Sequence, residues 1–132
     1  MRVLVVGAGG VGSSMVSIAA RREVFEHIVV ADVDLARATR AAARVGSPHV
    51  VATRVDASDK LDLIELARTC RADIIVNACD PRFNPPIFDA AFEAGCHYLD
   101  MAMHMSTPHP TDPHNLCGVK LGDAQFAVAP QW

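Results

Sequence analysis

The chain has 132 residues, the length of one domain, and its 51% hydrophobic and 20% charged residues exclude a disordered protein. Its formal charge is −3, from 12 Lys and Arg against 15 Asp and Glu, without a long run of like charges, so we expect neither nucleic acid nor a membrane as a partner. The first apolar run covers only residues 3–6, too few for a signal peptide or a membrane span, and we expect a cytoplasmic protein.

Five short runs with strand character follow one another along the first hundred positions. They predict strands at residues 3–6, 28–31, 50–55, 74–79 and 97–102. Helices are predicted between them. The first begins in or just after the glycines of residues 7–12, Asp34 and Asp59 can cap the second and third, and Asn84, followed by two prolines, can cap the fourth.

The regular alternation of strands and helices predicts an α/β protein with a parallel sheet and helices on both faces. Because crossovers between parallel strands are right-handed, few topologies remain. We expect a Rossmann-like doubly wound sheet with strand order 3-2-1-4-5, whose switch point lies between the first and fourth strands.

A glycine-rich turn follows the first strand and opens the first helix. It fits the pattern G-x-G-x-x-G, and an acid, Asp32, ends the next strand 20 residues after Gly12. Glycine triplets alone are common, but this combination within a βαβ unit predicts a dinucleotide site with the pyrophosphate at the helix N-terminus. The expected contacts in the turn are Gly7, Gly9, Gly10, Val11 and Gly12.

The acid at the end of the second strand bears on the choice of cofactor. Asp32 is expected to accept hydrogen bonds from the adenosine ribose and to repel a 2′-phosphate, so we expect NAD to be favoured over NADP. The next residues include no arginine, although Arg37 and Arg40 follow on the second helix and can turn toward such a phosphate. Asp34 is interpreted as a helix cap.

Two further strand ends are expected to face the cofactor. Asp56 and Ala57 follow the third strand, where Asp56 is either an acceptor for the adenine amino group or a loop acid. Asn77 and Ala78 end the fourth strand at the switch point. Asn77 is expected to face the nicotinamide-side ribose, the alternative being a buried side chain that serves only the backbone.

Several segments together resemble the nucleotide domain of the saccharopine dehydrogenase family: RVLVVGAGGVG, VVADVD, VDASD, NACDPRFN and AGCHYLDMA. The resemblance runs from Arg2 to about Ala127. It implies an oxidoreductase that uses NAD(P) to transfer a hydride to or from an imine formed between an amine and a carbonyl compound. By the same resemblance, a second domain would bind an amino acid-type substrate and supply most acid-base residues.

The resemblance also implies how the chain is divided. Residues 1–102 are expected to form the NAD(P)-binding Rossmann domain, and residues 103–132 a loop and a short helix that lead toward a missing substrate domain. We therefore expect the 132-residue chain alone to bind a cofactor weakly, to catalyse nothing and to be able to self-associate through an open sheet edge. No catalytic acid or base is assigned, and Asp100 is interpreted as a strand-end capping acid.

The sequence also bears on other kinds of site and function. His104, His109 and His114 are five residues apart and share no face of a helix or strand, and the four cysteines form no C-x-x-C pair, so no metal site is expected. A methyltransferase usually has G-x-G-x-G, and a flavin site usually has Glu in place of Asp32. A non-catalytic NAD-binding or regulatory module remains the alternative function.

Overall fold

The computed structural model describes residues 1–101, 107–120 and 122–132. The chain divides into two compact units, Met1–Ala102 and Met103–Trp132. Within the described ranges, no helix is both long and apolar enough to span a membrane.

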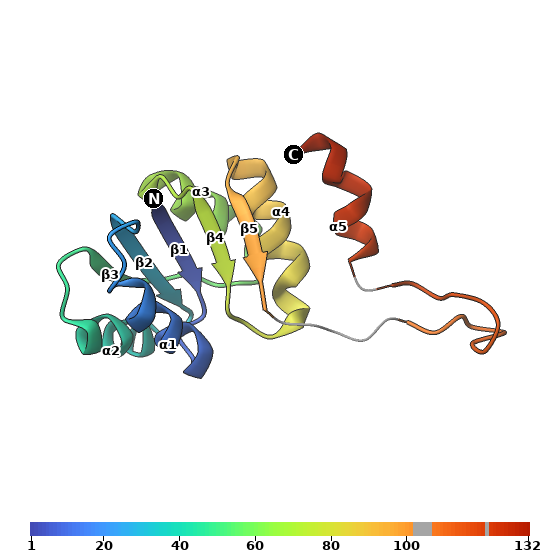
Figure 1. The fold of residues 1–132 in the computed structure, drawn as a ribbon, viewed down its shortest axis with the longest axis horizontal. Coiled ribbons are helices and arrows are strands. Elements are labelled where there is room, and N and C mark those ends of the chain that lie inside the picture. The colour runs from blue at the N-terminus through green and yellow to red at the C-terminus, as the bar shows by residue number, and fades with distance from the viewer. Residues whose placement is uncertain (102–106, 121) are drawn as a thin grey trace. The chain divides into compact units, whose positions relative to one another are not determined.

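The first unit is built on five parallel strands in the order β3-β2-β1-β4-β5 (Figure 1). The strands are β1 (Arg2–Val6), β2 (His27–Asp32), β3 (Val50–Arg54), β4 (Ile74–Asn77) and β5 (His97–Asp100). The helices between them are α1 (Gly10–Ala19), α2 (Leu35–Val45), α3 (Lys60–Cys70), the 3₁₀ turn η1 (Pro81–Phe83) and α4 (Asn84–Ala94). The predicted Rossmann-like fold and its strand order are confirmed.

Two helix starts follow directly from the sequence. The Asp34 side chain accepts hydrogen bonds from the backbone N–H groups two and three residues later, and Asp59 does the same at the start of α3. Each carboxylate thereby satisfies N–H groups that have no partner inside the helix. Both predicted caps are confirmed.

The start of α4 differs from the prediction. Asn84 is the first residue of the helix, and its side chain does not cap it. The 3₁₀ turn η1 directly precedes α4 and is itself capped by Asp80. The Asn84 side chain is buried and points toward Asn77. There its Oδ1 accepts a hydrogen bond of 2.8 Å from Asn77 Nδ2.

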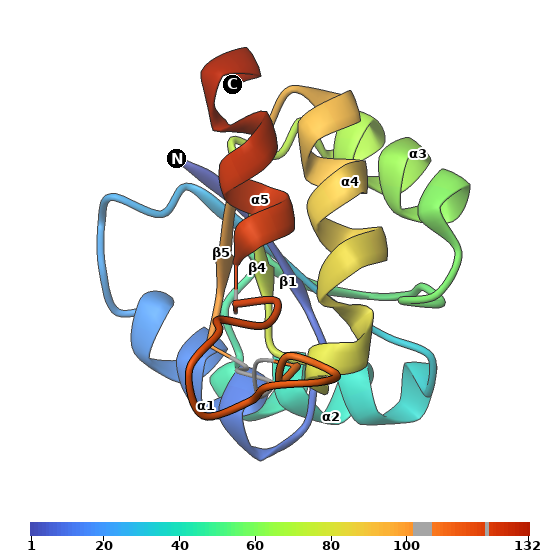
Figure 2. The same ribbon diagram turned by 90° about the vertical axis from the view of Figure 1, so that its right-hand side faces the viewer.

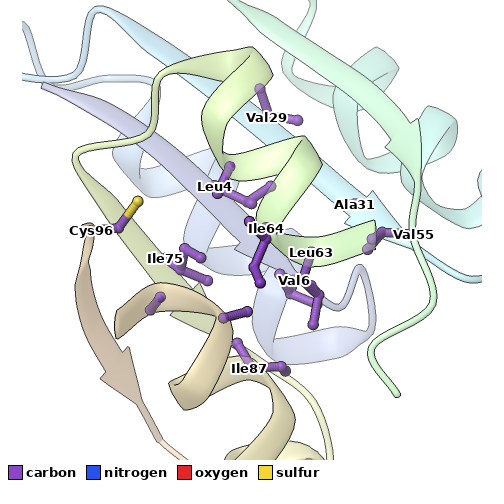
Figure 3. Packing of buried hydrophobic residues seen from close by; sticks show 13 residues of the cluster. Leu4, Val6, Val29, Ala31, Val55, Leu63, Ile64, Ile75, Ile87 and Cys96 are labelled. Atoms are coloured by element: carbon purple, nitrogen blue, oxygen red, sulfur yellow. The ribbon is translucent and has the colours of Figure 1, made fainter. Parts of the chain in front are cut away.

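The sheet is covered on both faces. On one face the apolar side chains of α1 and α2 pack against it, and Val16 of α1 is fully buried there. On the other face α3 and α4 lie side by side (Figure 2). Figure 3 shows Leu4 and Ile75 of the sheet meeting Leu63 of α3 and Ile87 of α4. These apolar layers hold the carboxyl ends of β1, β2 and β4 in fixed register.

The second unit contains a backbone bridge and a short helix. A backbone bridge joins Thr107 and Val119 through two antiparallel hydrogen bonds of 2.9 Å. The short helix expected within residues 103–132 is α5 (Asp123–Val128), followed by the 3₁₀ turn η2 (Ala129–Gln131). His104 lies outside the described residues.

Replacing Leu63 with alanine should lower the free energy of unfolding by about 2–5 kcal/mol, because truncating this fully buried side chain leaves a cavity between α3 and the sheet. Leu61 lies on the same helix but is 75% exposed, so Leu61→Ala should change the free energy by less than about 0.5 kcal/mol. Urea denaturation of both variants measures the difference. Equal losses would contradict the described packing of α3.

Candidate functional site

A cavity of about 530 Å³ opens at the carboxyl ends of β1 to β4, where the switch point of the sheet lies. Six of the residues expected to contact the cofactor line it together: Gly7, Gly9, Asp32, Asp56, Ala57 and Ala78. They come from four loops that are far apart in the chain. The remaining predicted glycine-turn residues, Gly10, Val11 and Gly12, form the first turn of α1.

The glycine turn is held by close backbone contacts. Gly7 has a φ of +100°, and a Cβ there would lie 2.9 Å from both the Ala78 carbonyl oxygen and Cys79 Sγ. A Cβ on Gly12 would overlap the Gly7 carbonyl oxygen. Only glycine allows β1, α1 and the loop after β4 to meet this closely.

Gly9 has a different environment. No heavy atom lies within 4 Å of the position that its Cβ would occupy, so the space in front of it is open. Gly9 is the N-cap residue of α1, and no side chain caps the helix. The N–H groups of the first turn and the helix dipole therefore favour an anion at this point.

The Asp32 side chain is only 6% exposed and holds two loops together. Its Oδ2 accepts the Ala8 N–H at 2.8 Å, and its Oδ1 accepts the Asp34 N–H at 2.9 Å. Arg37 Nη1 lies 3.5 Å from the same Oδ2. The first turn of α2 thus places the Arg37 guanidinium beside Asp32, although the two residues are not adjacent in sequence.

The acid after β3 lies at the cavity as well. Asp56 Oδ1 accepts hydrogen bonds from Ser58, from the hydroxyl at 2.6 Å and from the N–H at 2.9 Å. These two bonds lower the pKa of Asp56, and the bond from the Ser58 hydroxyl has the larger effect. Asp56 therefore both shapes its turn and presents a carboxylate to the cavity, so the two sequence readings are compatible.

Asn77 stands behind the cavity lining. It is fully buried, and its Oδ1 accepts the Cys79 N–H at 2.9 Å. Its Nδ2 donates to Asn84 Oδ1 at 2.8 Å and to the Tyr98 hydroxyl oxygen at 3.2 Å. The neighbouring Ala78 lines the cavity, and Asn77 supports the loop that carries it.

One wall of the cavity is formed by Cys79, Asp80, Arg82 and Phe83, and sequence reasoning did not identify Arg82 and Phe83. The Arg82 guanidinium lies 5.0 Å from the centre of the Phe83 ring, and its Nε lies 3.6 Å from Asp80 Oδ1. An Asp-Pro pair at residues 80–81 is a turn signal that indicates where this wall begins.

The surroundings of the thiol in this wall favour its protonated form. Burial, followed by the charges of Asp32 and Asp80, raises the pKa of Cys79 to about 11. The thiolate, which is the nucleophilic form, is therefore scarce near pH 7. Among the residues that the structure describes, no cluster of three His, Cys, Asp or Glu side chains is placed to hold a metal ion.

Comparison with known proteins points to one family. A family model described as the saccharopine dehydrogenase NADP binding domain matches residues 3–132. The carboxyaminopropylagmatine dehydrogenase of Synechocystis sp. is 38% identical over 101 residues, which cover 76% of this chain and 25% of that protein. The carboxynorspermidine synthase of Vibrio cholerae is 29% identical over 112 residues, which cover 78% of this chain and 27% of that protein.

A solved structure shares the fold. Apo saccharopine dehydrogenase (L-Glu forming) from Saccharomyces cerevisiae superimposes with a TM-score of 0.66 at 22% identity and covers 83% of this chain and 22% of that chain. This chain spans about a quarter of the length of the curated relatives that it matches.

Gly12→Ala should lower the free energy of unfolding by about 1–3 kcal/mol or more, because the added methyl group meets a backbone oxygen that cannot move away without shifting β1. Gly10 is the matched control. A Cβ there meets nothing within 4 Å, so Gly10→Ala should keep or slightly raise stability, by up to about 1 kcal/mol. Thermal denaturation of both variants tests the contact, and equal midpoints would contradict it.

Proposed function

Because this chain belongs to the saccharopine dehydrogenase NADP-binding domain family, we propose that it holds the nicotinamide dinucleotide of an oxidoreductase that transfers a hydride to or from an imine or amino acid substrate. One observation carries the proposal. The cavity at the switch point combines an open, uncapped helix N-terminus at Gly9 with the Asp32 carboxylate on the neighbouring strand. Pyrophosphate and ribose hydroxyls need these two groups.

The dinucleotide would lie across the carboxyl ends of the strands. Its pyrophosphate would pass over Gly9, where a Cβ is absent. There it would accept hydrogen bonds from the N–H groups of the first turn of α1. The adenosine ribose would face Asp32, and the adenine would lie by Asp56 and Ala57. The nicotinamide-side ribose would lie near Ala78 and Asn77, with Asn77 acting through its loop.

The names of the relatives indicate a substrate class. Carboxyaminopropylagmatine dehydrogenase and carboxynorspermidine synthase are both named for amine compounds that bear a carboxyl group. Such a compound forms by reduction of the imine between an amine and a carbonyl compound. We assign no catalytic acid or base to this chain. Its own contribution is to bind the cofactor and to orient the ring that gives or takes the hydride.

We propose NAD as the preferred cofactor, with NADP bound less tightly. Asp32 keeps free lone pairs for ribose hydroxyls, and a 2′-phosphate beside it meets a like charge. Arg37 reduces this repulsion, because its guanidinium already lies 3.5 Å from Asp32 and lines the cavity. Asp32 therefore favours NAD, and Arg37 keeps NADP from being excluded.

Gly9→Val should abolish measurable binding of NAD and NADP while leaving the thermal midpoint within a few degrees of the parent. The added Cβ meets no neighbouring atom within 4 Å, so the side chain extends into the open space in front of the turn. Titration calorimetry of parent and variant measures the loss. A variant that binds as tightly as the parent would show that the pyrophosphate does not pass over Gly9.

Arg37→Ala should weaken NADP by about 10- to 100-fold, because a charged hydrogen-bond donor to the 2′-phosphate is lost, and should change NAD much less. Arg40→Ala is the matched control, since Arg40 is an exposed arginine of the same helix that does not line the cavity. Asp32→Ser should shift the ratio of the two dissociation constants toward NADP. A parent chain that prefers NADP would contradict the role given to Asp32.

A further inference from the structure

Buried polar side chains are few in the described part of the chain, and two of them lie in contact behind the cavity. Asn77 is 0% and Asn84 is 3% exposed. Burying an amide is costly unless its hydrogen-bonding groups are satisfied. Asn77 meets this condition with three hydrogen bonds. Its Oδ1 accepts one from the Cys79 N–H, and its Nδ2 donates one to Asn84 Oδ1 and one to the Tyr98 hydroxyl oxygen. An apolar residue could fill the same space without this requirement.

The network continues into β5. Burial raises the pKa of Tyr98, and the charge of Asp100 and a hydrogen bond to it raise that pKa further. Tyr98 thus keeps its proton as a hydrogen-bond donor to Asp100, while its oxygen accepts a hydrogen bond from Asn77 Nδ2. The Phe88 ring of α4 packs edge-on against Tyr98, with ring centres 5.3 Å apart. The ends of β4 and β5 are thereby tied together.

The same network sets the position of the loop after β4. Asn77 Oδ1 fixes the Cys79 N–H at 2.9 Å, and the Ala78 N–H donates to the Val6 carbonyl oxygen at 2.8 Å. The glycine turn packs on this dipeptide, because Ala78 O and Cys79 Sγ lie 2.9 Å from where a Gly7 Cβ would stand. A displaced dipeptide would therefore move both a wall of the cavity and the support of the glycine turn.

We propose that Asn77 is a positioning residue for the dinucleotide: through its bonds to Cys79, Asn84 and Tyr98 it fixes the Ala78–Cys79 wall against which the cofactor and the glycine turn rest. The proposal rests on the function proposed for the cavity. It differs from a direct contact, because no surface of Asn77 is exposed. It also differs from a purely structural role, because the loop that Asn77 holds lines the cavity.

Asn77→Ala should raise the dissociation constant of NADH, measured by fluorescence titration, about tenfold, because the Cys79 N–H loses its partner and the wall loosens. The loosening has a readout that needs no ligand. N-ethylmaleimide should label Cys79 about tenfold faster in the variant, because the half-buried thiol becomes accessible. Cys117 is exposed and belongs to the second unit, so its labelling rate, followed by peptide mass spectrometry, is the internal control.

Two further variants separate positioning from stability. Ile87→Val trims a fully buried residue of α4 that makes no bond in the network, so it should lower the thermal midpoint without changing either readout. Tyr98→Phe removes one of the three Asn77 partners and should give intermediate changes of about threefold. If Asn77→Ala does not fold, Tyr98→Phe decides alone by comparison with Ile87→Val.

Failure of the positioning role of Asn77 and failure of the proposed cavity function give different results. Labelling and binding in Asn77→Ala within twofold of the parent would overturn the proposal, and so would equal changes in Ile87→Val. A parent chain that binds neither NADH nor NADPH would overturn the proposed function of the cavity. Faster labelling of Cys79 in Asn77→Ala of such a chain would still establish that Asn77 holds the loop, and unchanged labelling would refute that step as well.

Discussion

The absence of side chains at Gly7 and Gly12 is the constraint on which the rest of the site depends. With a Cβ at either position the end of β1, the start of α1 and the loop after β4 would overlap. Without one, α1 begins within reach of the cavity, and its free N–H groups point to where an anion is needed. The close approach also brings the Ala8 N–H to the Asp32 carboxylate at 2.8 Å, so the turn and the acid form one unit.

Asp32 consequently has two tasks that cannot be separated. It satisfies two backbone N–H groups in a nearly buried position, and it presents the same carboxylate to the cavity. Removing the acid would leave two loop N–H groups without partners, at a cost in stability as well as in ligand selectivity. Cofactor choice is more readily altered at Arg37, whose half-exposed side chain lies 3.5 Å from Asp32 and 4.0 Å from Asp34.

The sequence predicted those features that depend on local pattern. Apolar runs located the strands, and their alternation with helices fixed the sheet order, because handedness leaves few alternatives. Asp34 and Asp59 were found as caps because capping involves only the next three residues. The inward turn of Asn84 was missed, since it depends on Asn77 and on the 3₁₀ turn ahead of it. The return of Arg37 to Asp32 likewise needs the three-dimensional path of α2.

Asn77 shows why a strand-end residue is hard to interpret from sequence. At the end of a central strand, successive side chains point to opposite faces, and one residue decides whether a polar group faces a ligand or the packed interior. Here Asn77 points to the α4 side, where Asn84 and Tyr98 offer partners, and the small residue Ala78 takes the place at the cavity. A small residue at the lining leaves room for a ligand, and the amide behind it fixes the backbone. Rigidity and space at the switch point thus come from two adjacent residues, and the same amide ties the wall to Tyr98 and Asp100 at the end of β5.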